Sequence, residues 1–213
     1  GLGFDLHSPW GEARIESRLL GRFNVSNLLA VVASLGLLGY DFNAICAALA
    51  ELDPVPGRMN RLGGSEGCAL VVIDYAHTPD ALQQALASAR EHCANQLLCV
   101  FGCGGERDVG KRPLMAAIAE RLADRMIVTD DNPRSEDGAR IVADILAGFE
   151  RAEAVVVERD RRRAIERAVH CAGAGDVVLI AGKGHEPYQE VNGVMHAFDD
   201  VEVARTAIEA RPC

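Results

Sequence analysis

The order of apolar and polar residues changes near residue 54, and the change predicts two different parts of the chain. Residues 26–39 form a run rich in Ala, Leu and Val, and Asp41 can cap a second helix over residues 43–51. Residues 53–57 read Asp-Pro-Val-Pro-Gly, and two prolines with a glycine in that span disfavour a helix. We therefore expect a short helical part over residues 1–55 and a separate domain over residues 56–213.

After this break, short apolar runs alternate with helical segments. The runs are rich in β-branched residues and predict strands at 70–73, 97–101, 126–129, 154–157 and 177–180. Helices are predicted at 78–93, 112–123, 135–150, 160–171 and 199–210, and residues 195–198 predict an additional edge strand. Strands that are apolar throughout and alternate with helices favour an α/β fold, with a Rossmann-like, mostly parallel sheet covered by helices on both faces.

Composition and charge narrow the classes of function. The chain has 213 residues, 49% hydrophobic and 25% charged, which is enough apolar material for a core. Its formal net charge of −9 disfavours a nucleic-acid partner. The apolar run at 28–38 is too short to span a bilayer and no targeting segment opens the chain, so we expect a cytoplasmic protein without a membrane partner. The seven cysteines lack the spacing of zinc ligands, and we expect no metal site.

Polar segments with glycines follow four of the five predicted strands. They are residues 74–77, 102–108, 130–134 and 182–186. Ligands of open α/β sheets bind outside the carboxyl ends of the strands. We therefore expect the functional side chains at this one edge of the sheet.

Arginines and acids in these segments suit a zwitterionic ligand such as an amino acid. Arg107 and Arg134 can each bind a carboxylate through two parallel hydrogen bonds, and Asp131 and Glu186 can accept hydrogen bonds from an ammonium group. The alternative is that these side chains pair with one another as rim salt bridges, Arg134 with Asp131 or Glu136. The residues alone leave both interpretations open.

Three further features are ambiguous. Residues 105–111 match the glycine and lysine spacing of a phosphate-binding P-loop, but Arg112 stands where a Ser or Thr would hold Mg²⁺, so we expect no P-loop here. Asp74 can bind ribose hydroxyls or cap a turn, and His77 alone has no clear role. The arginine-rich residues 159–163 predict a solvated helix start without function.

Six motifs taken together resemble the Mur ligases. In chain order they are residues 22–27, 56–59, 74–80, 101–113, 131–134 and 182–186, which cover the chain from about residue 21 to residue 200. The resemblance implies a three-domain, ATP- and Mg²⁺-dependent enzyme that forms an amide bond in peptidoglycan synthesis through an acyl phosphate. Residues 1–55 would then be the tail of the central, ATP-binding domain, and residues 56–213 the C-terminal, amino-acid-binding domain.

The resemblance also implies what lies outside the chain. The catalytic residues and most Mg²⁺ ligands would lie upstream, so that the chain alone would be inactive. The acceptor substrate would be UDP-N-acetylmuramoyl-dipeptide, and the whole enzyme would be a monomer of the bacterial cytoplasm.

Carried over residue by residue, the resemblance assigns two sets of binding residues. The set for ATP is Asn24, Asn27, Arg58, Asp74 and His77. The set for the incoming amino acid is Arg107, Asp131, Asn132, Pro133, Arg134, Gly182 and Glu186.

The segment Asp-Asn-Pro-Arg at 131–134 is similar to that of the members that use meso-2,6-diaminopimelate. This amino acid has a second carboxylate at its far end that Arg134 could bind, whereas lysine has an ammonium group there that Arg134 would repel. The alternatives are a lysine-adding member, a ligase similar to folylpolyglutamate synthetase, and a non-catalytic small-molecule binding module.

Overall fold

The chain folds into two compact units, Gly1–Val55 and Pro56–Cys213. The computed structural model describes residues 1–64 and 67–210. The division falls within the Asp-Pro-Val-Pro-Gly segment, where the prolines interrupt regular structure. No helix in the described ranges is long and apolar enough to cross a bilayer.

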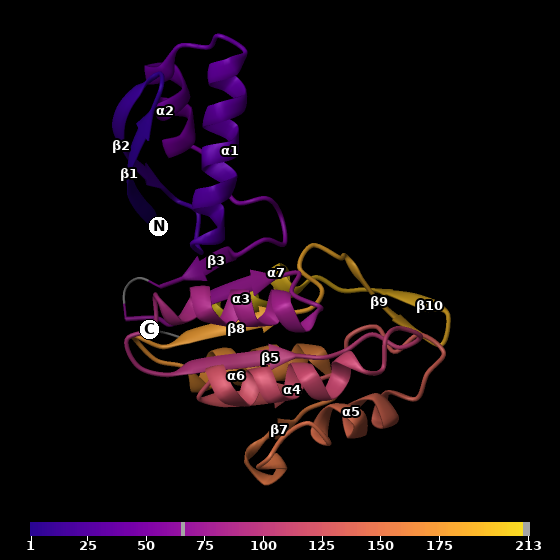
Figure 1. Cartoon of the computed structure of the whole chain (residues 1–213). Helices are drawn as coiled ribbons and strands as arrows, with labels where there is room; N and C mark the ends of the chain where they lie inside the picture. The colour runs from indigo at the N-terminus through magenta and orange to yellow at the C-terminus, as the bar shows by residue number, and fades with distance from the viewer. Residues whose placement is uncertain (65–66, 211–213) are drawn as a thin grey trace. The chain divides into compact units, whose positions relative to one another are not determined.

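The first unit is a β-hairpin packed against two helices (Figure 1). Strands β1 (Leu2–Ser8) and β2 (Gly11–Ser17) pair in antiparallel fashion, and helices α1 (Phe23–Leu37) and α2 (Phe42–Ala50) follow. The Asp41 carboxylate caps α2, as predicted, by accepting a hydrogen bond from the backbone N–H of Ala44. The core of this unit consists of Leu6, Ile15, Leu19, Leu28, Val32, Ile45 and Leu49.

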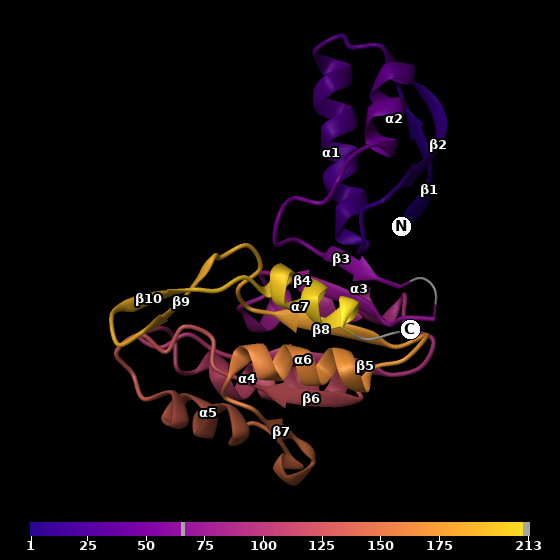
Figure 2. The same cartoon turned by 180° about the vertical axis from the view of Figure 1, so that it is seen from behind.

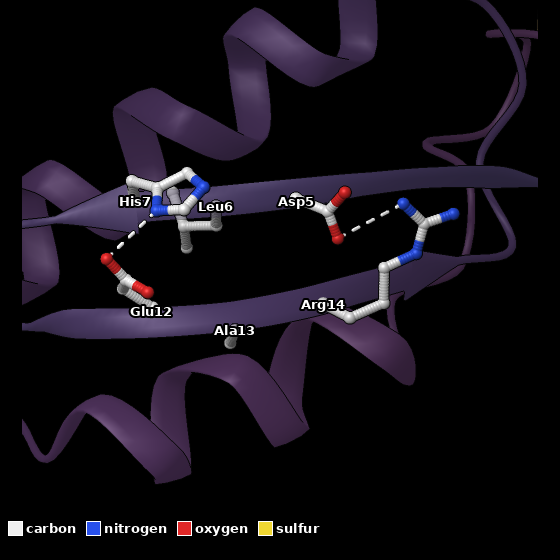
Figure 3. A pocket seen from close by; sticks show the side chains of 6 residues that line it. All are labelled: Asp5, Leu6, His7, Glu12, Ala13 and Arg14. Carbon is white, nitrogen blue, oxygen red and sulfur yellow. Dashed lines mark ion pairs between the residues drawn. The ribbon is translucent and has the colours of Figure 1, made fainter.

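The hairpin corrects the expectation that the part before residue 54 is only helical. Its apolar residues alternate with polar ones, so that each strand turns one face to the core and the other to solvent. The solvent face carries two cross-strand pairs, His7 Nδ1 with Glu12 Oε1 at 3.0 Å and Arg14 Nη1 with Asp5 Oδ1 at 3.3 Å (Figure 3). These exposed side chains line a hollow on the hairpin that contains none of the predicted site residues.

The second unit is built on a six-stranded sheet in the order β3-β4-β8-β5-β6-β7. All neighbouring strands are parallel except β3, which is antiparallel to β4. This arrangement confirms the predicted mostly parallel α/β fold. The strands are β3 (Asn60–Gly63), β4 (Leu70–Asp74), β5 (Leu97–Phe101), β6 (Arg125–Val128), β7 (Val156–Val157) and β8 (Val177–Ala181).

Helices cover both faces of this sheet (Figures 1 and 2). Helices α3 (Pro79–Arg90) and α4 (Lys111–Leu122) lie on one face, and α6 (Arg161–Cys171) and α7 (Asp200–Glu209) lie on the other. Alternate strand residues point toward α6 and α7 and form a core cluster with them, which includes Val71, Ile73, Val100, Val178, Ile180, Ile165 and Val203. Burial on both faces explains why the parallel strands are apolar throughout.

Two elements at the edge of the sheet are shorter than predicted. The strand expected at 154–157 is reduced to Val156–Val157, and a 3₁₀ turn at Ala152–Ala154 precedes it. Helix α5 spans only Gly138–Leu146, because the Asp137 carboxylate accepts a hydrogen bond from Ala139 N and so begins the helix three residues late.

The strand expected at 195–198 does not extend the main sheet. Instead, β10 (Val194–Ala197) pairs with β9 (Tyr188–Val191) in a separate antiparallel hairpin. Asn192 and Gly193 connect the two strands with φ angles of 50° and 75°. An Asn-Gly pair at positive φ is typical of a two-residue hairpin turn, so a signal for this hairpin was present in the sequence.

A fully buried ion pair joins the starts of α6 and α7. Arg161 Nε and Nη2 donate to Oδ1 and Oδ2 of Asp200 at 2.8 and 2.7 Å, and Nη2 also donates to the Ala181 carbonyl at 3.1 Å. Both side chains have a relative exposure of 0%. The expectation of a solvated helix start at 159–163 is therefore wrong for Arg161, which ties both helices to the end of β8.

We expect Asp200→Asn to lower the free energy of unfolding by about 3–5 kcal/mol, because the substitution leaves the buried Arg161 charge without its counter-ion. Arg205→Ala, which removes the exposed ion pair with Glu202 on the same helix, serves as the control and is expected to cost less than about 1 kcal/mol. Urea unfolding of the 213-residue chain measures both values. If Asp200→Asn and Arg205→Ala lower the free energy of unfolding equally, the buried pair contributes no more to stability than the exposed one.

Candidate functional site

The four polar segments identified in the sequence meet at one edge of the sheet. They follow β4, β8, β5 and β6, which are four adjacent parallel strands and therefore end at the same edge. The β9–β10 hairpin lies at the same end of the sheet (Figures 1 and 2). The candidate site consists of these loops, the hairpin and the turn that begins at Pro56.

The turn at residues 57–59 packs against the loop that follows β8. Gly57 has φ +75°, and a Cβ on it would lie 2.5 Å from the backbone nitrogen of His185, so only glycine permits this approach. Met59 N donates to Oδ2 of Asp74 at 2.9 Å. Asp74 therefore caps this turn, which is one of the two roles predicted for it.

The acidity of the Asp74 carboxyl is altered by its surroundings. Burial raises the pKa of the Asp74 carboxyl, while the hydrogen bond from Met59 N and the charge of Arg58 act in the opposite direction. The Arg58 guanidinium lies 5.0 Å from the centre of the Tyr75 ring. His77 lies beside the same ring, at 4.6 Å between centroids, and its Nδ1 is 2.8 Å from the Tyr75 carbonyl oxygen.

Three buried or half-buried side chains from two loops form one hydrogen-bonded cluster. Lys183 Nζ donates to Asn132 Oδ1 at 2.9 Å and lies 3.3 Å from Glu186 Oε2. Asn132 Nδ2 donates to the same Glu186 oxygen at 2.8 Å. On the other side, the Tyr75 hydroxyl is 3.4 Å from Glu186 Oε1, and burial together with the Glu186 charge raises the pKa of that hydroxyl. Glu186 thus lies where three loops meet.

Lys183 is a residue of this cluster that the sequence reasoning missed. Its side chain has 0% exposure, and its ammonium also lies 5.4 Å from the centre of the Tyr188 ring. A lysine between two glycines, directly after an apolar strand, was the available signal.

Arg134 is held in one orientation by the β9–β10 hairpin. Its backbone has φ +55°, and Arg134 N and O bond to the backbone of Glu190 and Asn192 at 3.0 and 2.7 Å. The side chain donates through Nη1 to the Gly105 carbonyl at 2.8 Å, and Nε lies 3.3 Å from Glu190 Oε2. The salt-bridge partner is therefore Glu190, and the expected partners Asp131 and Glu136 were wrong. Two of the three guanidinium nitrogens already have partners.

Arg107, another residue of the predicted amino-acid set, lies near the Arg134 side chain. A Cβ on Gly104 would lie 2.8 Å from Arg134 Nη1 and 3.7 Å from the exposed Arg107 side chain, so both arginines flank that glycine. Arg107 Nη1 donates to its neighbour's carbonyl, Glu106 O, at 3.3 Å. The structure thus brings the side chains of Arg107 and Arg134 close to the same glycine.

Asp131 and Gly182 lie next to each other in space although they belong to different loops. Gly182 has φ +119°, and a Cβ on it would lie 2.5 Å from Asp131 Oδ2, so any larger residue would disturb this buried carboxylate. The Gln189 side chain donates to the Asp131 carbonyl at 2.7 Å. Pro133 is buried, and its carbonyl accepts a hydrogen bond from Glu136 N at 3.1 Å.

Asn24 and Asn27 belong to the first unit, at the beginning of α1. Asn24 Nδ2 donates to the Leu20 carbonyl at 2.8 Å, and Asn27 Nδ2 donates to Asn24 Oδ1 at 2.9 Å. Their three-residue spacing places them on one face of the helix. The other ten predicted site residues belong to the second unit.

A second buried arginine holds the loops after β5 and β6 together. Arg112 Nη1 and Nη2 donate to the two oxygens of Glu136 at 2.7 Å each, and Nη1 also donates to Asp144 at 2.8 Å. Glu136 in turn accepts a hydrogen bond from Glu106 N at 3.0 Å. Arg112 lowers the pKa of the Glu136 carboxyl to about 2. Arg112, which interrupts the P-loop pattern, is thus a structural anchor, and Lys111 Nζ donates to the His77 carbonyl.

Cys103 lies within the loop after β5, but its surroundings do not suit a nucleophile. The thiol is buried, and this burial raises its pKa to about 12. Its sulfur is 3.8 Å from Met115 Sδ.

The fold and these loops define a recognised class of domain. Residues 57–184 match the family model described as Mur ligase, glutamate ligase domain, and the chain belongs to this family. Among curated relatives, the UDP-N-acetylmuramoyl-L-alanyl-D-glutamate--2,6-diaminopimelate ligase of Xanthomonas campestris is 62% identical over 211 residues, and that of Pseudomonas aeruginosa is 55% identical over 210. Each alignment covers 99% of this chain but only 43% of the relative.

Solved structures agree with this assignment. A diaminopimelate ligase of the same name superposes with a TM-score of 0.73 at 48% identity, over 98% of this chain and 42% of that chain. A folylpolyglutamate synthase of Mycobacterium tuberculosis superposes with a TM-score of 0.65 at 22% identity, over 84% of this chain and 44% of that one, and shares the fold. The chain spans about two fifths of the length of the relatives it matches.

We expect the unfolding free energy of Glu136→Gln to fall less than that of the wild type as the pH is lowered from 4.5 toward 2. The folded-state pKa of Glu136 is about 2, below its usual 4.5, so its contribution is complete above about pH 4.5 and is lost as the pH falls toward 2. Glu136→Gln should cost about 1.5–3 kcal/mol at pH 7, because it removes a charge-assisted pair, and progressively less below pH 4.5.

Unfolding free energies at pH 7, 4.5 and 3 measure this difference. Glu209→Gln, an exposed change at the end of α7, is the control and should follow the wild-type curve. If the difference in unfolding free energy between Glu136→Gln and the wild type is the same at all three pH values, the low folded-state pKa of Glu136 is contradicted.

Proposed function

We propose that this chain is the amino-acid-binding end of an ATP-dependent ligase that joins meso-2,6-diaminopimelate to UDP-N-acetylmuramoyl-L-alanyl-D-glutamate. In this reaction ATP phosphorylates the D-glutamate side-chain carboxylate, and the amine of the incoming amino acid displaces the phosphate. The names and identities of the relatives support the proposal. So does the arrangement of charges at the carboxyl edge of the sheet.

The observation that carries the proposal is the opposite charge of two neighbouring groups. Arg134 and Arg107 carry guanidinium groups and both lie near Gly104, whereas Glu186 carries a carboxylate that accepts a hydrogen bond from Asn132, two residues before Arg134. The far end of meso-2,6-diaminopimelate carries both a carboxylate and an ammonium group. The arginines suit the first group and Glu186 suits the second. Lysine lacks the far carboxylate and would place its ammonium toward Arg134.

Arg134 has limited freedom to bind that carboxylate. With Nη1 on the Gly105 carbonyl and Nε at Glu190, the described contacts leave Nη2 for a ligand. A bidentate contact through Nε and Nη2 therefore requires that Glu190 move away from Nε, whereas a single hydrogen bond from Nη2 does not. In both cases the guanidinium is oriented before the ligand arrives, which reduces the entropy that binding costs.

The chain also carries residues that fit a nucleotide. Arg58 is exposed and lies against the Tyr75 ring, so its guanidinium can be reached by a phosphate group. We assign Asp74 and His77 to the ribose side of the nucleotide and Asn24 and Asn27 to the adenine. We assign the Mg²⁺ ligands mostly to residues outside this chain, and the bound ion would neutralise phosphate charge.

We propose that residues 1–55 are the tail of the central, ATP-binding domain and that residues 56–213 are the C-terminal domain. Helix α1 supports the first assignment, since it is apolar on most of its surface but buries only Leu28, Val32 and Gly36. Leu29, Val31 and Leu37 are 42%, 38% and 81% exposed. Such a helix is typical of an element that packs against a larger partner on its other sides.

In this assignment the chain positions a reactant and supplies no nucleophile. Its residues hold the amino acid so that the attacking amine is near the acyl phosphate, and this kind of positioning lowers the entropic part of the barrier. We place the whole enzyme in the bacterial cytoplasm as a monomer without nucleic-acid or membrane partners.

The proposal is tested with a chimera that joins this chain to the preceding part of the Xanthomonas campestris relative. We expect ADP release and tripeptide product with meso-2,6-diaminopimelate, and none with the 213-residue chain alone. Product formed with lysine instead would indicate a lysine-adding enzyme. A chimera that binds diaminopimelate without forming product would favour a binding module.

In the same chimera, Arg134→Ala should raise the KM for diaminopimelate roughly ten- to a hundredfold, since a charge-assisted pair contributes about 1.5–3 kcal/mol. Arg134→Lys should recover little, because an ammonium group cannot reproduce the planar guanidinium contacts. The KM for ATP should change little. Arg121→Ala, on the outer surface of α4, is the control.

The alternative role for Arg134 is a purely structural salt bridge with Glu190. That role predicts a lower melting temperature for Arg134→Ala with an unchanged KM for diaminopimelate. Measuring both quantities separates the two roles.

A further inference from the structure

Lys183 is fully buried at the edge of the sheet where the amino acid is proposed to bind. A buried ammonium is costly unless its hydrogen bonds and charge are compensated. Here Asn132 Oδ1 accepts at 2.9 Å, Glu186 Oε2 lies at 3.3 Å, and the Tyr188 ring centre lies at 5.4 Å. The ammonium is therefore compensated by the residues that form the candidate site, and not by a separate structural network.

Lys183 determines which way the Asn132 amide points. Asn132 Oδ1 accepts hydrogen bonds from two donors, Lys183 Nζ and the backbone N–H of Glu190 at 3.0 Å. Because both neighbours are donors, the oxygen must face them and the NH₂ group must face Glu186. Rotation of the amide by 180° would place its oxygen against the Glu186 carboxylate, which is unfavourable.

Lys183 also contacts one carboxylate oxygen of Glu186, Oε2, and does not contact the other, Oε1. Oε2 is shared between Asn132 Nδ2 and Lys183 Nζ, whereas Oε1 has only a long contact of 3.4 Å with the Tyr75 hydroxyl. Glu186 keeps a side-chain exposure of 21%, so this carboxylate is accessible while the lysine beneath it is not. Glu186 can therefore accept a hydrogen bond from a ligand without losing its internal partners.

We propose that Lys183 is a positioning residue that fixes Asn132 and Glu186 so that Glu186 receives an ammonium group of the incoming amino acid. The inference rests on the proposed function, which supplies the amino acid. Lys183 itself does not contact the ligand, because it is fully buried beneath Glu186. It acts on the binding of the amino acid and not on that of the nucleotide.

The experiment uses the chimera with Lys183→Met, which keeps the approximate length of the side chain and removes its charge. We expect the KM for diaminopimelate to rise at least tenfold while the KM for ATP stays within about twofold of the wild type. Arg167→Met removes the charge of an exposed side chain on α6, outside the loops of the candidate site, and is the matched control, expected to leave both KM values unchanged.

A double variant separates positioning from stability. Lys183→Met removes the ammonium group that pairs with the Glu186 carboxylate, so it should also lower the melting temperature. Lys183→Met with Glu186→Gln removes both charges and should recover much of the melting temperature, but its KM for diaminopimelate should be no worse than that of Glu186→Gln alone. This non-additivity is expected only if Lys183 acts through Glu186. The double variant also provides a folded protein if the single variant does not fold.

Three results would overturn the inference. They are an unchanged KM for diaminopimelate in Lys183→Met, a parallel rise of both KM values, and additive effects of the two substitutions. A wild-type chimera that forms no product would count against the proposed function instead. In that case the inference is tested by calorimetric titration of the 213-residue chain with diaminopimelate. We expect Lys183→Met to weaken binding at least tenfold. Absence of binding to the wild-type chain would overturn both proposals.

Discussion

The buried pair between Arg161 and Asp200 is the interaction on which the site depends. It joins the first residues of α6 and α7, and through Arg161 Nη2 it also binds the carbonyl of Ala181, the last residue of β8. The loop that carries Gly182, Lys183 and Glu186 begins at the next residue. A hydrophobic pair could bury the same surface, but it would not fix the direction of a carbonyl at the start of a binding loop.

The same principle recurs near the neighbouring loops, where three other buried or half-buried cations have carboxylate partners. Arg112 pairs with Glu136, Arg134 with Glu190 and Lys183 with Glu186. These pairs compensate charge that would otherwise be costly to bury, and they fix the side chains before a ligand binds. The β9–β10 hairpin, which supplies Glu190 and Gln189, lies beyond the residues that match the family model.

The two units differ in how much of their apolar surface they bury. The second unit buries a core on both faces of its sheet and carries ten of the twelve predicted binding residues. The first unit has a small core and an apolar helix with exposed Leu and Val side chains. The relatives that match the chain are more than twice as long as the chain itself.

The sequence by itself determined the alternation of strands and helices, the break at residues 53–57 and the loops that carry the polar residues, because these follow from local periodicity, caps and prolines. It did not reveal the first hairpin, whose strands are short and polar on one face, nor β3, which lacks an apolar run. Only the tertiary structure decided that Arg161 and Arg112 are buried anchors, that Arg134 pairs with Glu190, and that Lys183 lies beneath Glu186. These outcomes depend on partners 24 to 56 residues away, or on burial created by other elements, and neither property is written in the local pattern.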